Sequence, residues 1–254
     1  FQTLVHQGTI TNAGAKMSKS KGNVVNPDEF IVRHGSDVFR MYLMFMGPFE
    51  MGGDWSDKGI SGTDRFILRL YEFFKNYENI SKKAPAKAKF VISELNDSEK
   101  IIYRKINQTV NKYGVELQNL RFNTAIAALM ELTNEITKHF ANASESLKTY
   151  ALERLLVMMA PLAPHFAEEC WEMLGNDKSI FVSRPNYEID RDALVEDSVN
   201  IAVQVSGKLR GTVAMPLDSA VEDVKAAALA LDSVAKHIEG KSVIKEIFVK
   251  NKIL

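Results

Sequence analysis

Apolar residues recur at helical spacing through the middle of the chain, so the pattern predicts a series of long amphipathic helices. Between residues 66 and 174 most apolar positions lie three or four residues apart, as on one face of a helix. Pro161 and Pro164 interrupt the last of these stripes, and Gly175 ends it. Four or five such helices joined by short loops are typical of an antiparallel bundle. The stripes consist of Phe66, Ile67, Leu70, Phe73, Phe74 and Tyr77; of Ile102, Ile106, Val110, Tyr113, Leu117 and Leu120; of Ile126, Leu129, Met130, Ile136 and Phe140; and of Leu152, Leu155, Leu156, Met159, Phe166, Cys170 and Leu174.

The part of the chain before this region has shorter and less regular patterns. The apolar positions of residues 1–8 have the spacing of a helix, and residues 9–11 then predict a short strand or turn edge. A stretch rich in glycine, proline and aspartate at 47–62 predicts a connection between packed units.

Two helices are predicted between these segments. Asn26 and Pro27 are typical of a helix start, with Asn26 as the N-cap and Pro27 at the first helical position. Gly35 ends this helix, and Ser36 or Asp37 can cap the next one. The second helix, with the sequence VFRMYLMFMG, is apolar nearly all round, which predicts burial on most sides.

The pattern changes near the end of the chain. Apolar and polar residues alternate over 201–205 and again over 209–215, with Ser206 and Gly207 between them, so a β-hairpin is predicted. Residues 219–231 are alanine-rich and predict a helix, and residues 243–249 predict another strand. Together these elements form a small α+β domain of about 60 residues.

Composition limits the kinds of partner. The 254 residues are 46% hydrophobic, enough for more than one core, and the 32 lysines and arginines equal the 32 aspartates and glutamates. Any nucleic-acid site must therefore be a local patch. Cys170 is the only cysteine, which excludes an internal disulfide and agrees with a reducing compartment. No apolar run is long enough to span a membrane and no cleavable signal is apparent, so we expect a cytoplasmic protein without a membrane partner.

Most candidate catalytic and metal-binding residues do not have the spacing in the sequence that such sites require. His165 and Glu169 lie one helical turn apart, but without a second histidine a contact on the helix surface explains them better than a metal. Residues 240–242 mimic the end of a phosphate-binding loop, yet Ala235 occupies the position of its first glycine. We therefore predict no metal site in this chain.

One stretch remains a candidate binding site: Lys16-Met17-Ser18-Lys19-Ser20. With Lys21 it places three lysines within six residues, between Gly14 and Gly22. Lysine ammonium groups on a flexible segment suit polyphosphate, and serine hydroxyls donate hydrogen bonds without crowding a ligand. By composition alone, a solvated surface loop explains the same residues.

The wider sequence carries a resemblance. The stretch KMSKSKGNVVNPDEFIVRHGSDVFRMYLMF resembles the second signature region of class I aminoacyl-tRNA synthetases, whose KMSKS loop it matches at all five positions. Within that class, MFMGPFEMGGDWSDKGISGTDRF is similar to the leucyl-tRNA synthetases, and IAVQVSGKLRGTVAMP resembles the appended domain of their bacterial members. The resemblance is strongest at residues 16–27, 36–58 and 200–216.

The resemblance implies a mainly α protein with three parts. Residues 1–58 would be the end of a Rossmann-type catalytic domain with the KMSKS loop and its connecting helices. Residues 59–190 would be an antiparallel helix bundle of the anticodon-binding type, and residues 195–254 a small α+β domain that contacts tRNA. The implied enzyme is a ligase that activates leucine with ATP and transfers it to tRNA(Leu).

The resemblance also assigns roles to the loop. Lys19 is expected to contact the ATP phosphates directly and Lys16 to support it, so these two are the candidate catalytic residues. Met17, Ser18 and Ser20 complete the ATP-binding segment by shaping the loop. Mg²⁺ is expected on the ATP, with no metal site in the chain.

The hairpin of the last domain offers a weaker site. Lys208 and Arg210 lie at or beside its turn, where two cations suit contact with tRNA phosphates, although turn solubility explains them almost equally well. Ser206 stands where the family commonly has asparagine, which leaves the turn type open.

The chain lacks parts that the implied enzyme needs. It opens on Phe1 and contains neither the His-x-Gly-His-type signature nor an editing domain, so we expect a processed or engineered piece, or one part of a split protein. Its expected partner is the N-terminal catalytic half, in the same parent chain or as a separate subunit. Alone it is expected neither to activate leucine nor to edit. The alternatives are a piece of a valyl, isoleucyl or methionyl enzyme, or a non-catalytic RNA-binding module.

Overall fold

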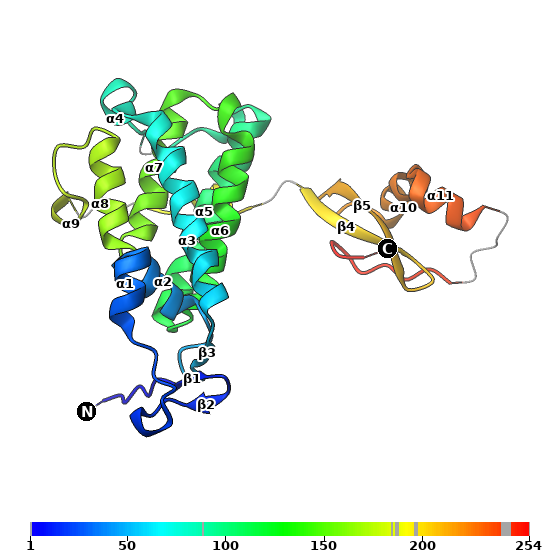
Figure 1. Cartoon of the computed structure of the whole chain (residues 1–254). Helices are drawn as coiled ribbons and strands as arrows, with labels where there is room; N and C mark the ends of the chain where they lie inside the picture. Colours follow the sequence, from blue (N-terminus) through cyan, green and yellow to red (C-terminus); the bar gives the residue numbers. More distant parts are fainter. Residues whose placement is uncertain are drawn as a thin grey trace. The chain divides into compact units, whose positions relative to one another are not determined.

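The computed structural model describes residues 2–87, 89–183, 185, 188–195, 198–239 and 245–253. The chain divides into two compact units, Phe1–Leu194 and Val195–Leu254. Figure 1 shows the first unit as a set of helices with a small sheet at one end, and the second as a hairpin with two helices. None of the described helices has the length and apolar character that crossing a bilayer requires.

The predicted helices are present in the first unit, and the chain is mainly helical as expected. Helices α5 and α6 pack along one another and are joined by three residues, so they run antiparallel. One continuous core contains or contacts the residues of the predicted stripes except Leu120, and Ile102, Leu129 and Leu155 are fully buried. The long helices are α3 (Asp57–Phe74), α5 (Asp97–Gln118), α6 (Phe122–His139), α7 (Glu145–Met159) and α8 (Pro164–Met173); α4 (Ile80–Lys83) and α9 (Ile180–Ser183) are short.

A capping box begins α5. The Asn96 side chain accepts a hydrogen bond from the Glu99 N–H, and the Glu99 carboxylate accepts one from the Asn96 N–H, both at 3.0 Å. Glu99 also accepts from the Ser144 N–H at 2.9 Å, which ties the start of α5 to the start of α7. Burial acts to raise the pKa of Glu99, but the hydrogen bonds from Ser144 and Asn96, together with the charge of Lys87, outweigh it and hold the pKa below its ordinary value.

The small sheet has the strand order β2-β1-β3. Strand β1 (Ile10–Asn12) pairs antiparallel with β2 (Ala15–Lys16) and parallel with β3 (Gly53–Trp55). The crossover from β1 to β3 runs through β2, the lysine segment and the helices α1 (Pro27–His34) and α2 (Ser36–Phe45). The predicted Asn26 cap is confirmed, since its side chain accepts from the Asp28 N–H at 3.2 Å.

The rings around Trp55 fasten this sheet to the helices. Trp55 is buried, and its ring packs against Phe30 of α1 and against Phe39 and Tyr42 of α2 at centroid distances of 4.7, 5.9 and 5.2 Å. The Tyr42 hydroxyl also donates to the Ser56 carbonyl and accepts from the Ser56 N–H, each at 3.0 Å.

The predicted helix over 1–8 is wrong for the described residues 2–8. Leu4 is 88% exposed and Val5 51%, so their apolar face has no core to pack on within the described chain. Gly8 instead runs against Gly52, where a Cβ would come within 2.0 Å of the Gly52 nitrogen, and its N–H donates to the Phe49 carbonyl at 2.8 Å. The described residues 2–8 therefore have no regular structure in place of the helix.

The predicted connection 47–62 ends earlier than expected. The Ser56 hydroxyl accepts from the Gly59 N–H at 3.3 Å and caps α3, which starts at Asp57. The glycines after it suggested a loop, but burial of Ile60 on the helix face outweighs their low helix propensity.

Asp37 caps a different helix from the one predicted. Gly35 is the N-cap of α2, with no side-chain hydrogen bond. The Asp37 carboxylate instead accepts from the Phe166 N–H at 2.6 Å and pairs with the His165 Nδ1 at 2.9 Å, at the start of α8. Sequence spacing could not show this, because the partners are brought together only by the packing of α2 on α8.

The predicted hairpin is present in the second unit as β4 (Ser198–Val205) and β5 (Lys208–Pro216). Ser206 and Gly207 both have positive φ, at 52° and 74°, which answers the question of turn type in favour of a type I′ turn. The predicted helix over 219–231 is α10 (Val221–Leu229).

Two features of this unit differ from the prediction. A second helix, α11 (Asp232–Ile238), was not predicted, because Val234 is its only buried residue and leaves no apolar stripe in the sequence. In the predicted strand 243–249, Val243 and Ile244 lie outside the described residues, and Lys245–Phe248 have no regular structure. Val249 makes only an isolated bridge with Ile253.

We predict that Ser206→Asn stabilises the hairpin by about 0.5–1 kcal/mol, because asparagine tolerates the left-handed conformation better than serine. Amide exchange of β4 and β5 in the 254-residue chain measures the effect. Thr212→Asn, at an exposed strand position, is the control and should not stabilise the hairpin. Equal or faster hairpin exchange in Ser206→Asn would contradict the prediction.

Candidate functional site

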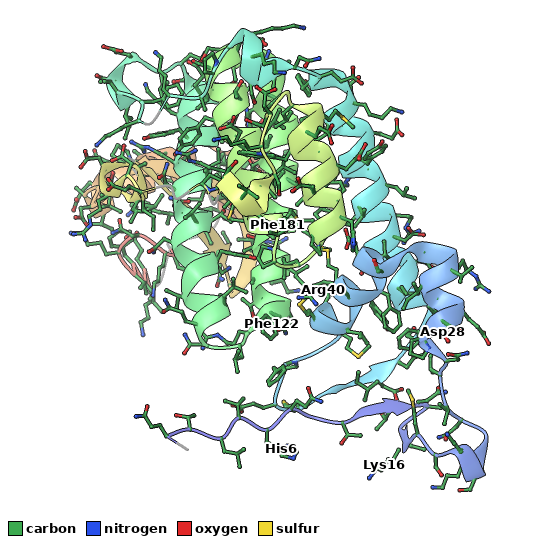
Figure 2. The ribbon with its side chains drawn as sticks, turned by 90° about the vertical axis from the view of Figure 1, so that its left-hand side faces the viewer. His6, Lys16, Asp28, Arg40, Phe122 and Phe181 are labelled. Atoms are coloured by element: carbon green, nitrogen blue, oxygen red, sulfur yellow. The ribbon has the colours of Figure 1, made fainter. Side chains whose placement is uncertain are left out.

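Residues 16–22, called the lysine loop below, begin at the end of strand β2 of the small sheet. This sheet lies at one end of the first unit, beyond α1 and α2 (Figure 2). Lys16 ends β2, and Lys19–Lys21 form one 3₁₀ turn that closes at Gly22 with φ of 66°. All three lysines are exposed, whereas Met17 is partly buried and packs against the core. The loop is therefore attached at Met17 and presents its charges to solvent.

Asn23 holds the two sides of the loop together. Its side-chain Oδ1 accepts from the Ser18 N–H at 2.9 Å, and its Nδ2 donates to the Lys16 carbonyl at 3.3 Å. The Asn23 carbonyl in turn accepts from the Asn12 side chain at 3.0 Å. One amide thus fixes the backbone on both sides of Met17.

Asp54 of β3 holds the hairpin from which the loop extends. Ala13 and Gly14 form its turn with φ of 53° and 72°. A single oxygen of Asp54, Oδ1, accepts from the Thr11 hydroxyl at 2.6 Å and from the Gly14 N–H at 2.9 Å. These two hydrogen bonds, the one from Thr11 foremost, hold the pKa of Asp54 below its ordinary value.

The lysines are free to bind an anion. Within the part of the chain that the structure describes, no carboxylate forms an ion pair with Lys16, Lys19 or Lys21. The hydroxyls of Ser18 and Ser20 lie 2.8 Å apart on the same loop. The structure thus brings all five residues of the predicted ATP-binding segment onto one braced loop.

Lys208 and Arg210 belong to the second unit. Lys208 follows the hairpin turn directly and is exposed, together with Leu209. Arg210 is half-buried beside the register shift at Val203 and Gln204. Lys208 is therefore the more accessible of the two predicted tRNA contacts.

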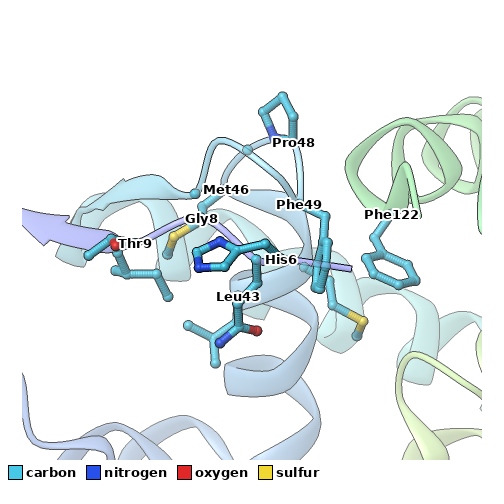
Figure 3. Close-up of a pocket in the computed structure, with 13 residues that line it drawn as sticks. His6, Gly8, Thr9, Leu43, Met46, Pro48, Phe49 and Phe122 are labelled. Carbon is cyan, nitrogen blue, oxygen red and sulfur yellow. The ribbon is translucent and has the colours of Figure 1, made fainter. Parts of the chain in front are cut away.

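A cleft of about 660 Å³ lies at the start of β1, before the loop (Figure 3). Figure 3 shows the His6 ring within it and the Phe49 and Phe122 rings beside one another, at a centroid distance of 5.7 Å. Its lining includes Leu43, Met44 and Met46 but no lysine of the loop. The cleft therefore offers an apolar surface and not a phosphate site.

Sequence reasoning missed Asn23, Thr11 and Asp54. Asn23 carried a usable signal, because an asparagine directly after a left-handed glycine can turn back onto its own loop. Thr11 and Asp54 are 43 residues apart, and only the parallel pairing of β1 with β3 brings them together. Among the described residues, no three histidine, cysteine, aspartate or glutamate side chains form a group that could hold a metal.

Comparison with known proteins defines the class. Residues 1–52 match the tRNA synthetases of class I (I, L, M and V), and residues 99–226 match the anticodon-binding domain of tRNA ligases. The chain therefore belongs to the class I tRNA synthetases, which confirms the resemblance found at the lysine loop.

Within this class the chain is similar to leucine–tRNA ligases. It is 39% identical to the enzyme of Petrotoga mobilis and 38% identical to that of Thermotoga maritima, in each case over its whole length. It spans 31% of the length of these relatives. Among solved structures it resembles the LeuRS of Agrobacterium radiobacter K84 in a ternary complex with tRNA and LeuAMS, with a TM-score of 0.76 and 27% identity. That match covers 97% of this chain and 32% of the LeuRS chain.

We predict that the Asp54 contact persists at mildly acidic pH. A depressed pKa means that the ionised carboxylate is the form that stabilises the hairpin, so its contribution is present at neutral pH and is lost only as pH falls through the lowered pKa. The Gly14 amide shift, followed by NMR, should titrate below about 3.9, the ordinary aspartate value. In Asp54→Asn this titration should vanish. A midpoint at or above the ordinary value would show the prediction to be wrong.

Proposed function

We propose that this chain is part of a leucine–tRNA ligase, to which it supplies the loop that binds the ATP phosphates and surfaces that bind tRNA. One observation carries the proposal: the KMSKS segment is intact and its lysines are exposed. They form no ion pair with a carboxylate in the described chain, and hydrogen bonds from the Asn23 side chain hold the backbone of the segment. The similarity to leucine–tRNA ligases over the whole chain supports leucine as the substrate.

The proposed reaction begins with activation of leucine. A leucine carboxylate oxygen forms a bond to the α-phosphorus of ATP, the bond from that phosphorus to the bridging oxygen breaks, and pyrophosphate leaves. A hydroxyl of the terminal ribose of tRNA(Leu) then forms a bond to the leucyl carbonyl carbon, the bond from that carbon to the phosphate oxygen breaks, and AMP leaves. Mg²⁺ bound to ATP would neutralise part of the phosphate charge.

The lysine loop would act by electrostatic stabilisation. Negative charge grows on the phosphoryl oxygens and on the leaving pyrophosphate, and Lys19, with Lys16 in support, would stabilise it. Ser18 and Ser20 would donate hydrogen bonds at the same place, and Met17 would hold the loop to the core. No nucleophile or general base is required from this chain.

The proposed layout assigns each part a task. Residues 1–58 complete a catalytic domain whose N-terminal half lies outside this chain, residues 59–190 form the bundle of the anticodon-binding type, and residues 195–254 contact tRNA. The match to an anticodon-binding domain over 99–226 supports a tRNA-binding role for the bundle and the following hairpin.

We predict that Lys19→Ala in the complete enzyme lowers kcat/KM for ATP about 10²–10³-fold, the usual cost of removing one stabiliser of transition-state charge. Pyrophosphate exchange measures this step, and tRNA(Leu) affinity should stay nearly unchanged. Lys21→Ala is the matched control and should have a much smaller effect on exchange.

Two outcomes would refute this proposal. A loss confined to tRNA affinity would show that Lys19 has a different role. Leucine-dependent exchange by the 254-residue chain alone, at the rate of a complete synthetase, would show that the N-terminal half is not needed.

We predict that Lys208→Ala weakens tRNA(Leu) binding and lowers the slope of log affinity against log salt by about one, as loss of one phosphate contact does. Exposure of Lys208 beside the turn supports this role. Lys236→Ala, an exposed lysine of α11 in the same unit, is the charge-matched control. Equal slopes for wild type and Lys208→Ala would assign Lys208 to solubility instead.

A further inference from the structure

We propose that Asn23 and Asp54 are positioning residues for the lysine loop. Neither is proposed to touch a substrate; Asn23 acts on the backbone of Lys16 and Ser18, and Asp54 acts on the hairpin that precedes them. This inference rests on the proposed role of the loop in binding ATP.

The Asn23 contacts require both halves of an amide. Its oxygen accepts from an N–H, and its nitrogen donates to a carbonyl, across the loop. Aspartate offers only the acceptor, and alanine offers neither. The left-handed turn at Gly22 brings the chain back so that the next residue reaches Lys16 and Ser18.

The Asp54 contacts require an oxygen acceptor, which the carboxylate supplies. Both the Thr11 hydroxyl and the Gly14 N–H donate to the same Oδ1 atom. An asparagine side chain can present an oxygen at that position, whereas alanine cannot. Asp54→Asn is therefore a conservative variant that separates geometry from charge.

These two contacts matter because the lysine side chains are long and exposed. Each lysine must lose rotamer freedom to hold a phosphate, and a mobile backbone would add its own entropy cost. A fixed backbone limits that cost to the side chains. Misplacement by about 1 Å is enough to lower a rate about 100-fold.

The first test measures the loop in the 254-residue chain without any substrate. Asn23→Ala should speed exchange of the Ser18 amide at least tenfold, because that N–H then loses its acceptor. Asn119→Ala is the matched control, since it removes a similar local hydrogen bond, from Asn119 Nδ2 to the Val115 carbonyl, at the end of α5. Unchanged Ser18 exchange in Asn23→Ala would overturn the proposal directly.

The second test measures catalysis in the complete enzyme. Asn23→Ala should lower kcat/KM for ATP about 10–100-fold in pyrophosphate exchange. KM for leucine and affinity for tRNA(Leu) should stay within about twofold, because a positioning role acts only through the loop. Asn23→Asp, which keeps the Ser18 acceptor, should fall between Asn23→Ala and wild type. Asp54→Ala should lose activity that Asp54→Asn largely restores.

A combined variant separates positioning from general destabilisation. If Asn23 acts through the loop lysines, adding Asn23→Ala to a variant that carries both Lys16→Ala and Lys19→Ala should cost less than about threefold more. A full multiplicative loss would mean that Asn23 only stabilises the fold, and the proposal would fail. If Lys19→Ala itself has no effect, the proposed function of the loop fails. If Lys19→Ala lowers exchange and Asn23→Ala does not, only the positioning role fails.

Discussion

Parallel pairing of β1 with β3 is the contact on which the position of the lysine loop depends. Ile10, Thr11 and Asn12 lie opposite Gly53, Asp54 and Trp55. This register places the Asp54 carboxylate beside the Thr11 hydroxyl and the Gly14 N–H, at the start of the loop hairpin. It also directs Trp55 into the rings of α1 and α2. A shift of one residue would exchange the faces of these two side chains and remove both contacts.

Helix α2 connects this sheet to the bundle. Toward the sheet, Tyr42 packs on Trp55 and bonds the Ser56 backbone, and a Cβ on Gly59 would come within 2.8 Å of the Tyr42 ring. Toward the bundle, Asp37 accepts from the first turn of α8. A carboxylate at a helix N-terminus is favourable, and Asp37 and Phe166 are buried whereas His165 is exposed. The loop is thus held by a chain of close contacts that begins in the bundle core.

Local patterns were enough to predict most of the fold. The helical stripes located α3 and α5–α8, alternation located the hairpin, and a run of three lysines located the candidate site. Predictions failed where a distant partner decides the outcome. Asp37 caps α8 and not its own helix, and residues 2–8 have no regular structure because no described residue buries Leu4 and Val5. The two residues that hold the loop were not predicted either. Asn23 has the character of an ordinary polar loop residue in the sequence, and Asp54 lies 40 residues from its partner Gly14.

The distribution of charge around the loop follows from these contacts. The chain has a formal net charge of +0, so a global field does not attract an anion; only a local excess of cations does. Asp54 holds the hairpin at the start of the loop, and its negative charge offsets part of that excess. Its Oδ1 is occupied by two neutral donors, a hydroxyl and a backbone N–H, and Asn23 contributes no charge at all. Because no lysine of the loop forms an ion pair with a carboxylate in the described chain, the ammonium groups of Lys16 and Lys19 stay available to a polyphosphate.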